Sequence, residues 1–343
     1  MNKIFVFGVL LVLLFGCTEQ EAPPEQPPIE PPPEQPPVEP EENITEEPVE
    51  LEYPLKGVSL STRGDEYFLQ FFEEATEAGE VVMWAGDWND LSDGAPVVVT
   101  EFPSTYDYDY IPLVEVTYYT QGEGELIRPF DESTRQGYKE DTIAFVEKYQ
   151  PEYFVMGIET DIMYEKSPDD YEEFVVFYNE MYDEIKKVSP NTKVFTVFQL
   201  EGMKGCELWQ EKSCNSSNSH WELIDDFKLD IVAFSTYPCL VYKDPSDIPE
   251  DHYTEISEHV SKPIAFTENG WHTEAYPPEW ESSEEEQAEY ITRFFELTKD
   301  LNVEVTVWSF MYGQGTIQPF NTMGLRRPDG TARPAWDEWV KGK

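Results

Sequence analysis

Short apolar runs recur at regular intervals from residue 55 to the C-terminus, and they limit the possible folds more than any other feature of the chain. The runs are continuous and rich in β-branched residues, so they lack the alternation of a strand with one face in water. Continuous runs of this kind are typical of strands buried on both faces. The eight strand candidates are Gly57–Leu60, Val81–Ala85, Ile111–Val116, Phe154–Gly157, Val194–Phe198, Ile231–Ser235, Ile264–Thr267 and Val303–Trp308.

Helical patterns lie between most of these strand candidates. Two of them have recognisable starts, "SPDD" at 167–170 and "SSEEE" at 282–286, where a serine precedes an acidic first turn. Helices after the second, fifth and sixth strands are less distinct. The clear patterns cover Asp65–Ala78, Arg135–Tyr149, Asp169–Val188 and Glu284–Leu301.

This alternation predicts the fold class. Eight strands that alternate with helices over residues 55–343 fit an α/β fold of the (β/α)8 TIM-barrel type. A doubly wound open sheet is the main alternative. The segment after the first strand, "SLSTRGDEY", lacks the glycine-rich phosphate loop of a dinucleotide-binding sheet, which weakens that alternative. We therefore expect one barrel domain over residues 55–343.

The first 54 residues predict export and a spacer. Residues 1–17 join a basic start to an apolar run and end in "LFGC", which resembles a lipobox and predicts a signal peptide with lipid attached to Cys17. The alternative is an uncleaved anchor or ordinary secretory signal in which Cys17 has no role. Residues 18–54 hold twelve prolines, twelve glutamates and no lysine or arginine, which predicts a disordered linker. We expect a lipid-anchored protein on the extracellular face of the cell membrane, or a secreted one.

Charge and cysteine content exclude some function classes. The formal net charge of -47 argues against nucleic acid and against docking on anionic lipid through protein charge, because phosphates attract clustered Lys and Arg. After Cys17 three cysteines remain, which allow at most one intramolecular disulfide. Cys206 and Cys214 are the expected pair, since they are close together in a loop. The cysteines and histidines show no ligand spacing, so we expect no metal and no cofactor.

In a (β/α)8 barrel, functional side chains lie at the C-terminal ends of the strands, which share one mouth. Glu159 follows the fourth strand, and Glu268 ends the seventh, in "FTENGW". Tyr237 follows the sixth strand and Trp308 ends the eighth. We therefore expect two carboxyl groups, a phenol and an indole at one mouth. Further candidates for binding a substrate are Asn269 and Trp271 after the seventh strand and Trp84 and Asp87 in and after the second.

Glycoside hydrolysis needs this set of groups. One carboxylic acid protonates the leaving oxygen while a second carboxylate attacks the anomeric carbon, at a separation of about 5–5.5 Å in a retaining enzyme. Aromatic faces stack on the apolar faces of sugar rings. The strand ends thus predict a carbohydrate substrate.

The order of these motifs resembles that of the clan A glycoside hydrolases, (β/α)8 barrels with an acid/base glutamate after the fourth strand and a nucleophilic glutamate at the end of the seventh. "GIETD" and "FTENGW" match those places, so the resemblance implies that Glu159 is the acid/base and Glu268 the nucleophile of a retaining mechanism. It also implies that Tyr237 in "STYP" supports the nucleophile and that Trp308 is a sugar platform. The pattern looks most like that of the endo-β-1,4-galactanase group and the poorly characterised barrels near it.

One position departs from this pattern. The clan usually has an asparagine before the acid/base glutamate, and its amide binds the sugar 2-hydroxyl, whereas this chain has Ile158. Either another group such as Asn269 or Thr160 supplies the hydrogen bond, or the site is altered or inactive. An inactive barrel would be a glycan-binding lipoprotein at the cell surface. A metal-dependent hydrolase on the same fold is a second alternative. In each case we expect a monomer.

Each candidate residue also has a purely structural interpretation. Glu268 would form an ion pair with an arginine such as Arg63, and Glu159 would be a solvated loop charge. Tyr237 would pack a loop before its proline, and Trp308 and Trp84 would belong to the core. A structure distinguishes these interpretations.

Overall fold

The computed structural model describes residues 54–121, 124–315 and 317–341. The predicted signal peptide with Cys17, and all of the predicted linker except Pro54, lie outside the described residues and stay predictions. Within the described ranges, no helix is both long enough and apolar enough to cross a bilayer.

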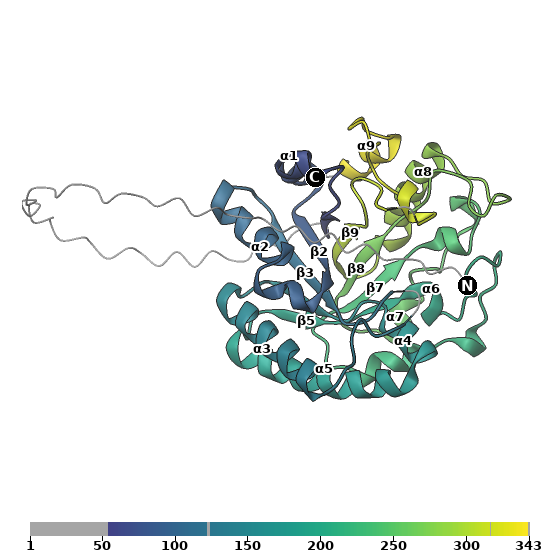
Figure 1. Ribbon diagram of the computed structural model, residues 1–343. Helices are drawn as coiled ribbons and strands as arrows, with labels where there is room; N and C mark the ends of the chain where they lie inside the picture. Colours follow the sequence, from purple (N-terminus) through teal and green to yellow (C-terminus); the bar gives the residue numbers. More distant parts are fainter. Residues whose placement is uncertain (1–53, 122–123, 316, 342–343) are drawn as a thin grey trace, which may run out of the picture. The chain divides into compact units, whose positions relative to one another are not determined.

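A parallel sheet forms the centre of the domain (Figure 1). Its strands are ordered β5-β4-β3-β2-β1-β9-β8-β7-β6, and all neighbours in this order are parallel. The two edge strands, β5 and β6, are consecutive in the chain and are separated only by Thr196. The sheet therefore curls into a nearly closed barrel, as predicted for a TIM-type fold. The strands are β1 Leu55–Ser59, β2 Val81–Asp87, β3 Ile111–Thr117, β4 Tyr153–Met156, β5 Lys193–Phe195, β6 Val197–Gln199, β7 Val232–Thr236, β8 Ile264–Asn269 and β9 Val303–Trp308.

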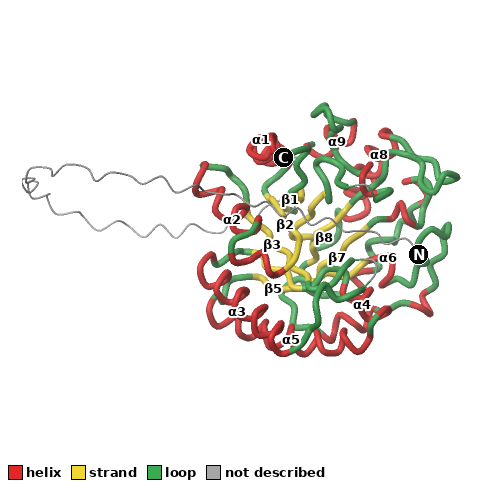
Figure 2. The backbone as a smooth tube through the Cα atoms, in the orientation of Figure 1, coloured by secondary structure: helices red, strands yellow, loops and turns green. Residues whose placement is uncertain are grey.

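Helices surround the strands, which lie at the centre of the domain in Figure 2. Of the three connections with unclear helices, only two are irregular in the structure: an α-helix follows β2, whereas β6 and β7 are followed mainly by short 3₁₀ segments. The α-helices are α1 Phe68–Ala78, α2 Ala95–Tyr106, α3 Glu132–Tyr149, α4 Thr160–Lys166, α5 Pro168–Val188, α6 Leu200–Met203, α7 Ile256–His259, α8 Glu284–Thr298 and α9 Pro334–Val340. The 3₁₀ segments are η1 Asp65–Tyr67, η2 Trp88–Ser92, η3 Ser216–Asn218, η4 Trp221–Asp226, η5 Pro238–Leu240, η6 Pro245–Asp247 and η7 Phe320–Thr322.

Local sequence explains where the two helices with recognised starts begin. Ser283 caps α8, because its hydroxyl accepts a hydrogen bond from the backbone N–H of Glu286 at 3.1 Å. Helix α5 begins at Pro168, whose missing N–H costs nothing at the first helical position. Its first turn is acidic and its last turn basic, which matches the helix dipole.

Alternation along the strands decides which side chains enter the barrel. Ser59 Oγ donates to the Ser309 carbonyl, and Ser309 in turn contacts Tyr237, so this set faces the interior. Trp308 lies one position earlier and faces the helices, where its ring contacts Trp339 with centroids 5.7 Å apart. The barrel interior is therefore polar near its C-terminal end, whereas Trp308 lies in the layer beneath the helices.

Candidate active site

Glu159 follows β4 in a turn that requires a glycine. Gly157 has a φ of 88°, and a Cβ there would lie 2.9 Å from side-chain atoms of Phe174 and Thr196. Glu159 itself is left-handed, with φ 56° and ψ 52°, a conformation that costs a non-glycine residue about 1–3 kcal/mol. Its side chain is 8% exposed, and its carboxyl accepts a hydrogen bond from Ser235 Oγ at 2.7 Å. The strained turn thus holds Glu159 against β7, inside the mouth.

Glu268 is directed into the same mouth by a bulge in β8. Ser235 pairs with Glu268, but the preceding residues pair in a different register, so the pairing skips Thr267. Bulges of this kind re-aim a side chain and are common next to active sites. Glu268 is half-buried, and both carboxyl oxygens are held: Oε2 accepts from Tyr237 Oη at 2.6 Å and Oε1 from Gln121 Nε2 at 2.9 Å.

The surroundings of the two carboxyl groups separate their acidities. Burial raises the pKa of Glu159 well above its ordinary value, and the negative charge of Glu268 raises it further. Burial also raises the pKa of Glu268, but the hydrogen bonds from Tyr237 and Gln121 act in the opposite direction. The surroundings thus oppose ionisation of Glu159 more strongly than that of Glu268. A neutral acid beside a carboxylate is the arrangement from which acid/base roles are assigned.

The ion pair proposed as an alternative for Glu268 does not form. Arg63 donates to Gln70 Oε1 at 3.1 Å and to the Asp329 carbonyl at 3.2 Å instead. Glu268 thus keeps its charge without a guanidinium partner from Arg63.

Tyr237 is fully buried and connects the nucleophile candidate to β9. Besides its bond to Glu268, its hydroxyl lies 2.7 Å from Ser309 Oγ, and Ser309 accepts from the backbone N–H of Asn269 at 3.0 Å. Burial, and next the charge of Glu268, raise the pKa of Tyr237 well above its ordinary range, so the phenol stays a donor. The structure thus brings Tyr237 to Glu268, and it adds Ser309, which sequence reasoning missed.

Glu115, in β3, is a third carboxyl group at the site and was also missed. It is fully buried, and neither of its oxygens has a hydrogen-bond partner. Burial raises its pKa well above the ordinary value, followed by the charges of Glu268 and Glu159. Its register partner in β2, Ala85, is exposed. The one signal in the sequence was an acidic residue within an otherwise apolar strand.

The predictions for Trp308 and Trp271 are wrong, because neither indole has an exposed face. Trp308 is fully buried, donates to the Met323 carbonyl at 2.9 Å, and contacts the rings of Trp339 and Tyr290. Trp271 is also fully buried and stacks on Tyr290 with centroids 5.1 Å apart. A ring must present a face to stack on a sugar. Both tryptophans therefore belong to the layer between sheet and helices.

The two residues suggested as replacement donors to a sugar are buried as well. Asn269 is fully buried, and its amide oxygen accepts from the hydroxyl of Tyr290. Thr160 is fully buried and donates to the Val197 carbonyl at 3.3 Å. Neither presents a donor at the surface of the mouth, which corrects the expectation for Asn269.

Trp84 and Asp87 lie in β2, and their surroundings narrow their roles. Trp84 is 7% exposed, which favours the core interpretation. Asp87 is partly exposed and forms a two-pronged ion pair with Arg128, with Oδ1 2.7 Å from Nη1. Arg128 also lies 5.1 Å above the ring of Trp88. Asp87 is thus a charge-neutralised group at the strand end, and its contact with a sugar hydroxyl stays a prediction.

The loop after α6 is crosslinked by a disulfide between Cys206 and Cys214, the pair expected from the sequence. Cys239 is a free and fully buried thiol. Burial raises the pKa of this thiol. It is therefore poorly suited to act as a nucleophile.

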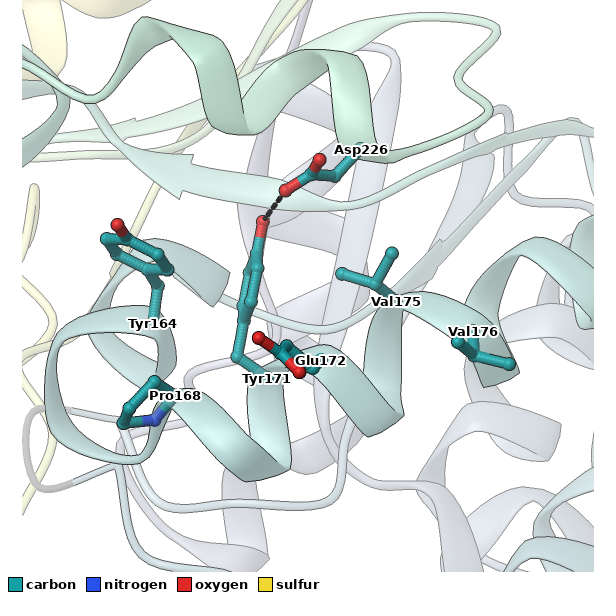
Figure 3. A pocket seen from close by; sticks show the side chains of 7 residues that line it. All are labelled: Tyr164, Pro168, Tyr171, Glu172, Val175, Val176 and Asp226. Atoms are coloured by element: carbon teal, nitrogen blue, oxygen red, sulfur yellow. Dashed lines mark hydrogen bonds between the residues drawn. The ribbon is translucent and has the colours of Figure 1, made fainter.

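A hollow of about 390 Å³ lies elsewhere, between α4, α5 and η4 (Figure 3). Across this hollow, Tyr171 donates to Asp226 Oδ2 at 2.9 Å. The other residues that line the hollow are Tyr164, Pro168, Glu172, Val175 and Val176. None of these is a candidate catalytic residue. Across the described part of the chain, no three His, Cys, Asp or Glu side chains are placed to hold a metal ion.

Comparisons with known proteins show similarity at the level of structure. No family model matches the chain, and no curated protein does. A family 39 glycoside hydrolase from the gut symbiont Bacteroides cellulosilyticus WH2 matches with a TM-score of 0.60 at 16% identity, over 84% of this chain and 63% of that one. A GH113 β-1,4-mannanase matches with a TM-score of 0.54 at 17% identity, over 84% and 99%. A Bifidobacterium dentium β-glucuronidase matches with a TM-score of 0.55 at 15% identity, over 84% and 46%.

At these identities the comparisons show the fold. The chain spans less than two thirds of the family 39 and glucuronidase structures but covers nearly the whole mannanase. The TIM-barrel architecture predicted from the strand pattern is thereby confirmed.

Proposed function

We propose that the barrel is a retaining glycoside hydrolase that acts on a β-linked poly- or oligosaccharide, with Glu159 as acid/base and Glu268 as nucleophile. One observation carries the proposal: Ser235 donates to the carboxyl group of Glu159 and pairs in register with Glu268, so the two carboxyl groups lie at neighbouring strand ends. The fold shared with several glycoside hydrolases supports it. A likeness to the endo-β-1,4-galactanase group is the narrower form of the same proposal.

The proposed mechanism is a double displacement. Glu159 gives its proton to the glycosidic oxygen while a carboxylate oxygen of Glu268 attacks the anomeric carbon, and the leaving sugar departs as an alcohol. The resulting ester at Glu268 carries no charge, so the repulsion that raised the pKa of Glu159 disappears. Glu159 then accepts a proton from water while the water oxygen attacks the anomeric carbon, which breaks the bond to the Glu268 carboxylate and releases the sugar with its original configuration. The loss of one charge thus changes Glu159 from acid to base.

We extend the proposal to the setting in which the barrel works. Lipid attached to Cys17 would anchor the protein at the extracellular face of the membrane, and residues 18–54 would hold the barrel away from it as a linker. If the signal is an ordinary secretory one, the protein is released instead. We propose that it works as a monomer in either setting.

Release of reducing sugar by the purified protein, measured across a panel of β-glycans, tests the proposal. Glu268→Gln and Glu159→Gln are measured in parallel, with Glu172→Gln, an exposed glutamate of α5, as the matched control. Release by the wild type and the control, and none by the two site variants, is the expected result. Binding of a glycan without release by any of these proteins would replace the hydrolase with a glycan-binding barrel.

A further inference from the structure

Gln121 is an exposed residue whose side chain touches the proposed nucleophile. Its Nε2 donates to Glu268 Oε1 at 2.9 Å. A primary amide has two N–H groups and a carbonyl oxygen, so one bond to Glu268 leaves the second N–H and the oxygen free for a ligand. No donor among the residues that the structure describes is bonded to Gln121 Oε1. The amide therefore has unused hydrogen-bonding capacity next to the carboxylate.

The loop that carries Gln121 is fastened to the end of β4. An antiparallel bridge joins Tyr119 to Leu126, and the N–H of Thr120 donates to the Glu125 carbonyl at 2.8 Å. Tyr119 is fully buried, and its hydroxyl donates to the backbone carbonyl of Ile158. The backbone carbonyl of Ile158, the residue found where the clan has an asparagine, thus anchors the loop that carries Gln121 to the site.

Other amide or hydroxyl donors near the two glutamates are not available in the same way. Ile158 has no polar side-chain atom and is 1% exposed. Asn269 is fully buried, so its Nδ2, which has no hydrogen-bond partner, is shielded from a ligand in the mouth, and its amide oxygen accepts from Tyr290. Thr160 is fully buried and donates to the Val197 carbonyl. Gln121 is exposed and bonded to Glu268, so it is suited to meet a sugar there.

We propose that Gln121 binds the sugar hydroxyl next to the anomeric carbon and thereby supplies the hydrogen bond that Ile158 cannot make. This inference rests on the proposed glycosidase function. When Glu268 attacks the anomeric carbon, the hydroxyl on the neighbouring carbon is brought beside the same carboxylate, within the reach of a group bonded to it. Hydrogen bonds to this hydroxyl strengthen in the transition state of glycoside hydrolysis. Gln121 is then a specificity residue for sugars that carry a free 2-hydroxyl.

A double comparison, of each sugar with its 2-deoxy analogue and of wild type with variants, tests the proposal. The probes are 4-nitrophenyl β-glycosides of galactose, mannose and glucose and of their disaccharides, each with its 2-deoxy analogue. For whichever pair the wild type cleaves, kcat/KM is measured with wild type, Gln121→Met and the control Gln136→Met. Gln136 is also exposed and donates to a carboxylate, that of Glu140, but it lies on α3. The intrinsic reactivity of each sugar cancels in the ratio between enzymes.

The expected result is that the penalty for removing the 2-hydroxyl is at least about tenfold smaller in Gln121→Met than in wild type, because transition-state bonds to this hydroxyl are worth several kcal/mol. The acid limb of kcat/KM should also move to higher pH in Gln121→Met, since its bond lowers the pKa of Glu268. Gln136→Met should change neither quantity.

An equal 2-deoxy penalty in wild type and Gln121→Met would overturn the inference while the hydrolase proposal stands. If the wild type cleaves no probe and releases no sugar from any glycan, the hydrolase proposal fails and the inference fails with it. A smaller penalty in Gln121→Met without a shift of the acid limb would still support sugar binding, because the penalty depends on the 2-hydroxyl alone.

Discussion

The hydrogen bond from Tyr237 to Glu268 makes a quantitative prediction. Tyr237→Phe keeps the buried ring and removes the hydroxyl that lies 2.6 Å from Glu268 Oε2. A hydrogen bond to a charged group is worth about 1.5–3 kcal/mol, and one pKa unit corresponds to about 1.4 kcal/mol. Because this bond favours the ionised form, its loss should raise the pKa of Glu268 by about one to two units. The pH at which Glu268 becomes a competent nucleophile rises by the same amount.

The assay is kcat/KM as a function of pH with the glycan that the wild type cleaves, since this profile reports groups of the free enzyme. Tyr178→Phe is the matched control, because Tyr178 lies on α5 and its hydroxyl donates to the Lys228 carbonyl at 3.0 Å. The control should lose about 1 kcal/mol of stability and leave the profile unchanged. An acid limb that stays in place, or moves to lower pH, in Tyr237→Phe would refute the reasoning.

Three further predictions concern stability. The pKa of Glu115 is higher in the folded protein than in the unfolded chain. The protonated side chain therefore contributes its full share of folding stability below the ordinary pKa of glutamic acid, and this share is lost as pH rises toward the pKa in the folded protein. Glu115→Gln should therefore gain stability relative to wild type as pH rises, measured by urea unfolding at two pH values, and an equal difference at both would contradict this. Cys206→Ser with Cys214→Ser should lower the unfolding free energy by about 2.5 kcal/mol, because a short loop is opened, and an unchanged urea midpoint would speak against it. Trp308→Ala should cost about 3–5 kcal/mol of stability, as for a buried core aromatic, whereas a higher KM at unchanged stability would restore the sugar-platform interpretation.

Apolar runs predicted the barrel well, since strands buried on both faces leave little choice of residue. The last strand has the predicted bounds, Val303–Trp308. The fifth run was predicted as one strand but is divided at Thr196, whose hydroxyl donates to the Gly157 carbonyl at 3.0 Å. This interruption depends on a tertiary contact and leaves no trace in a short apolar run. The irregular connections after β6 and β7 were indistinct because their 3₁₀ segments are too short to show periodicity.

In the site, too, the features set by topology were predictable from the sequence and those set by tertiary contacts were not. Glu159 and Glu268 were chosen as candidates because strand ends share one mouth, a rule that depends on topology. Trp308 was misplaced because a difference of one residue changes the face of a strand, and the inward position belongs to Ser309. Glu115 was overlooked because the rule considers only strand ends. Gln121 lies in a loop, where spacing predicts no contact.

The stereochemistry of hydrolysis tests the central claim most directly. Proton NMR of the first sugar released from the responsive β-glycan distinguishes the two anomers before mutarotation mixes them. Retention through Glu268 predicts that the β-anomer appears first and that Glu268→Gln releases neither. The α-anomer as first product, or release by Glu268→Gln at the wild-type rate, would contradict the assignment of Glu268 as nucleophile.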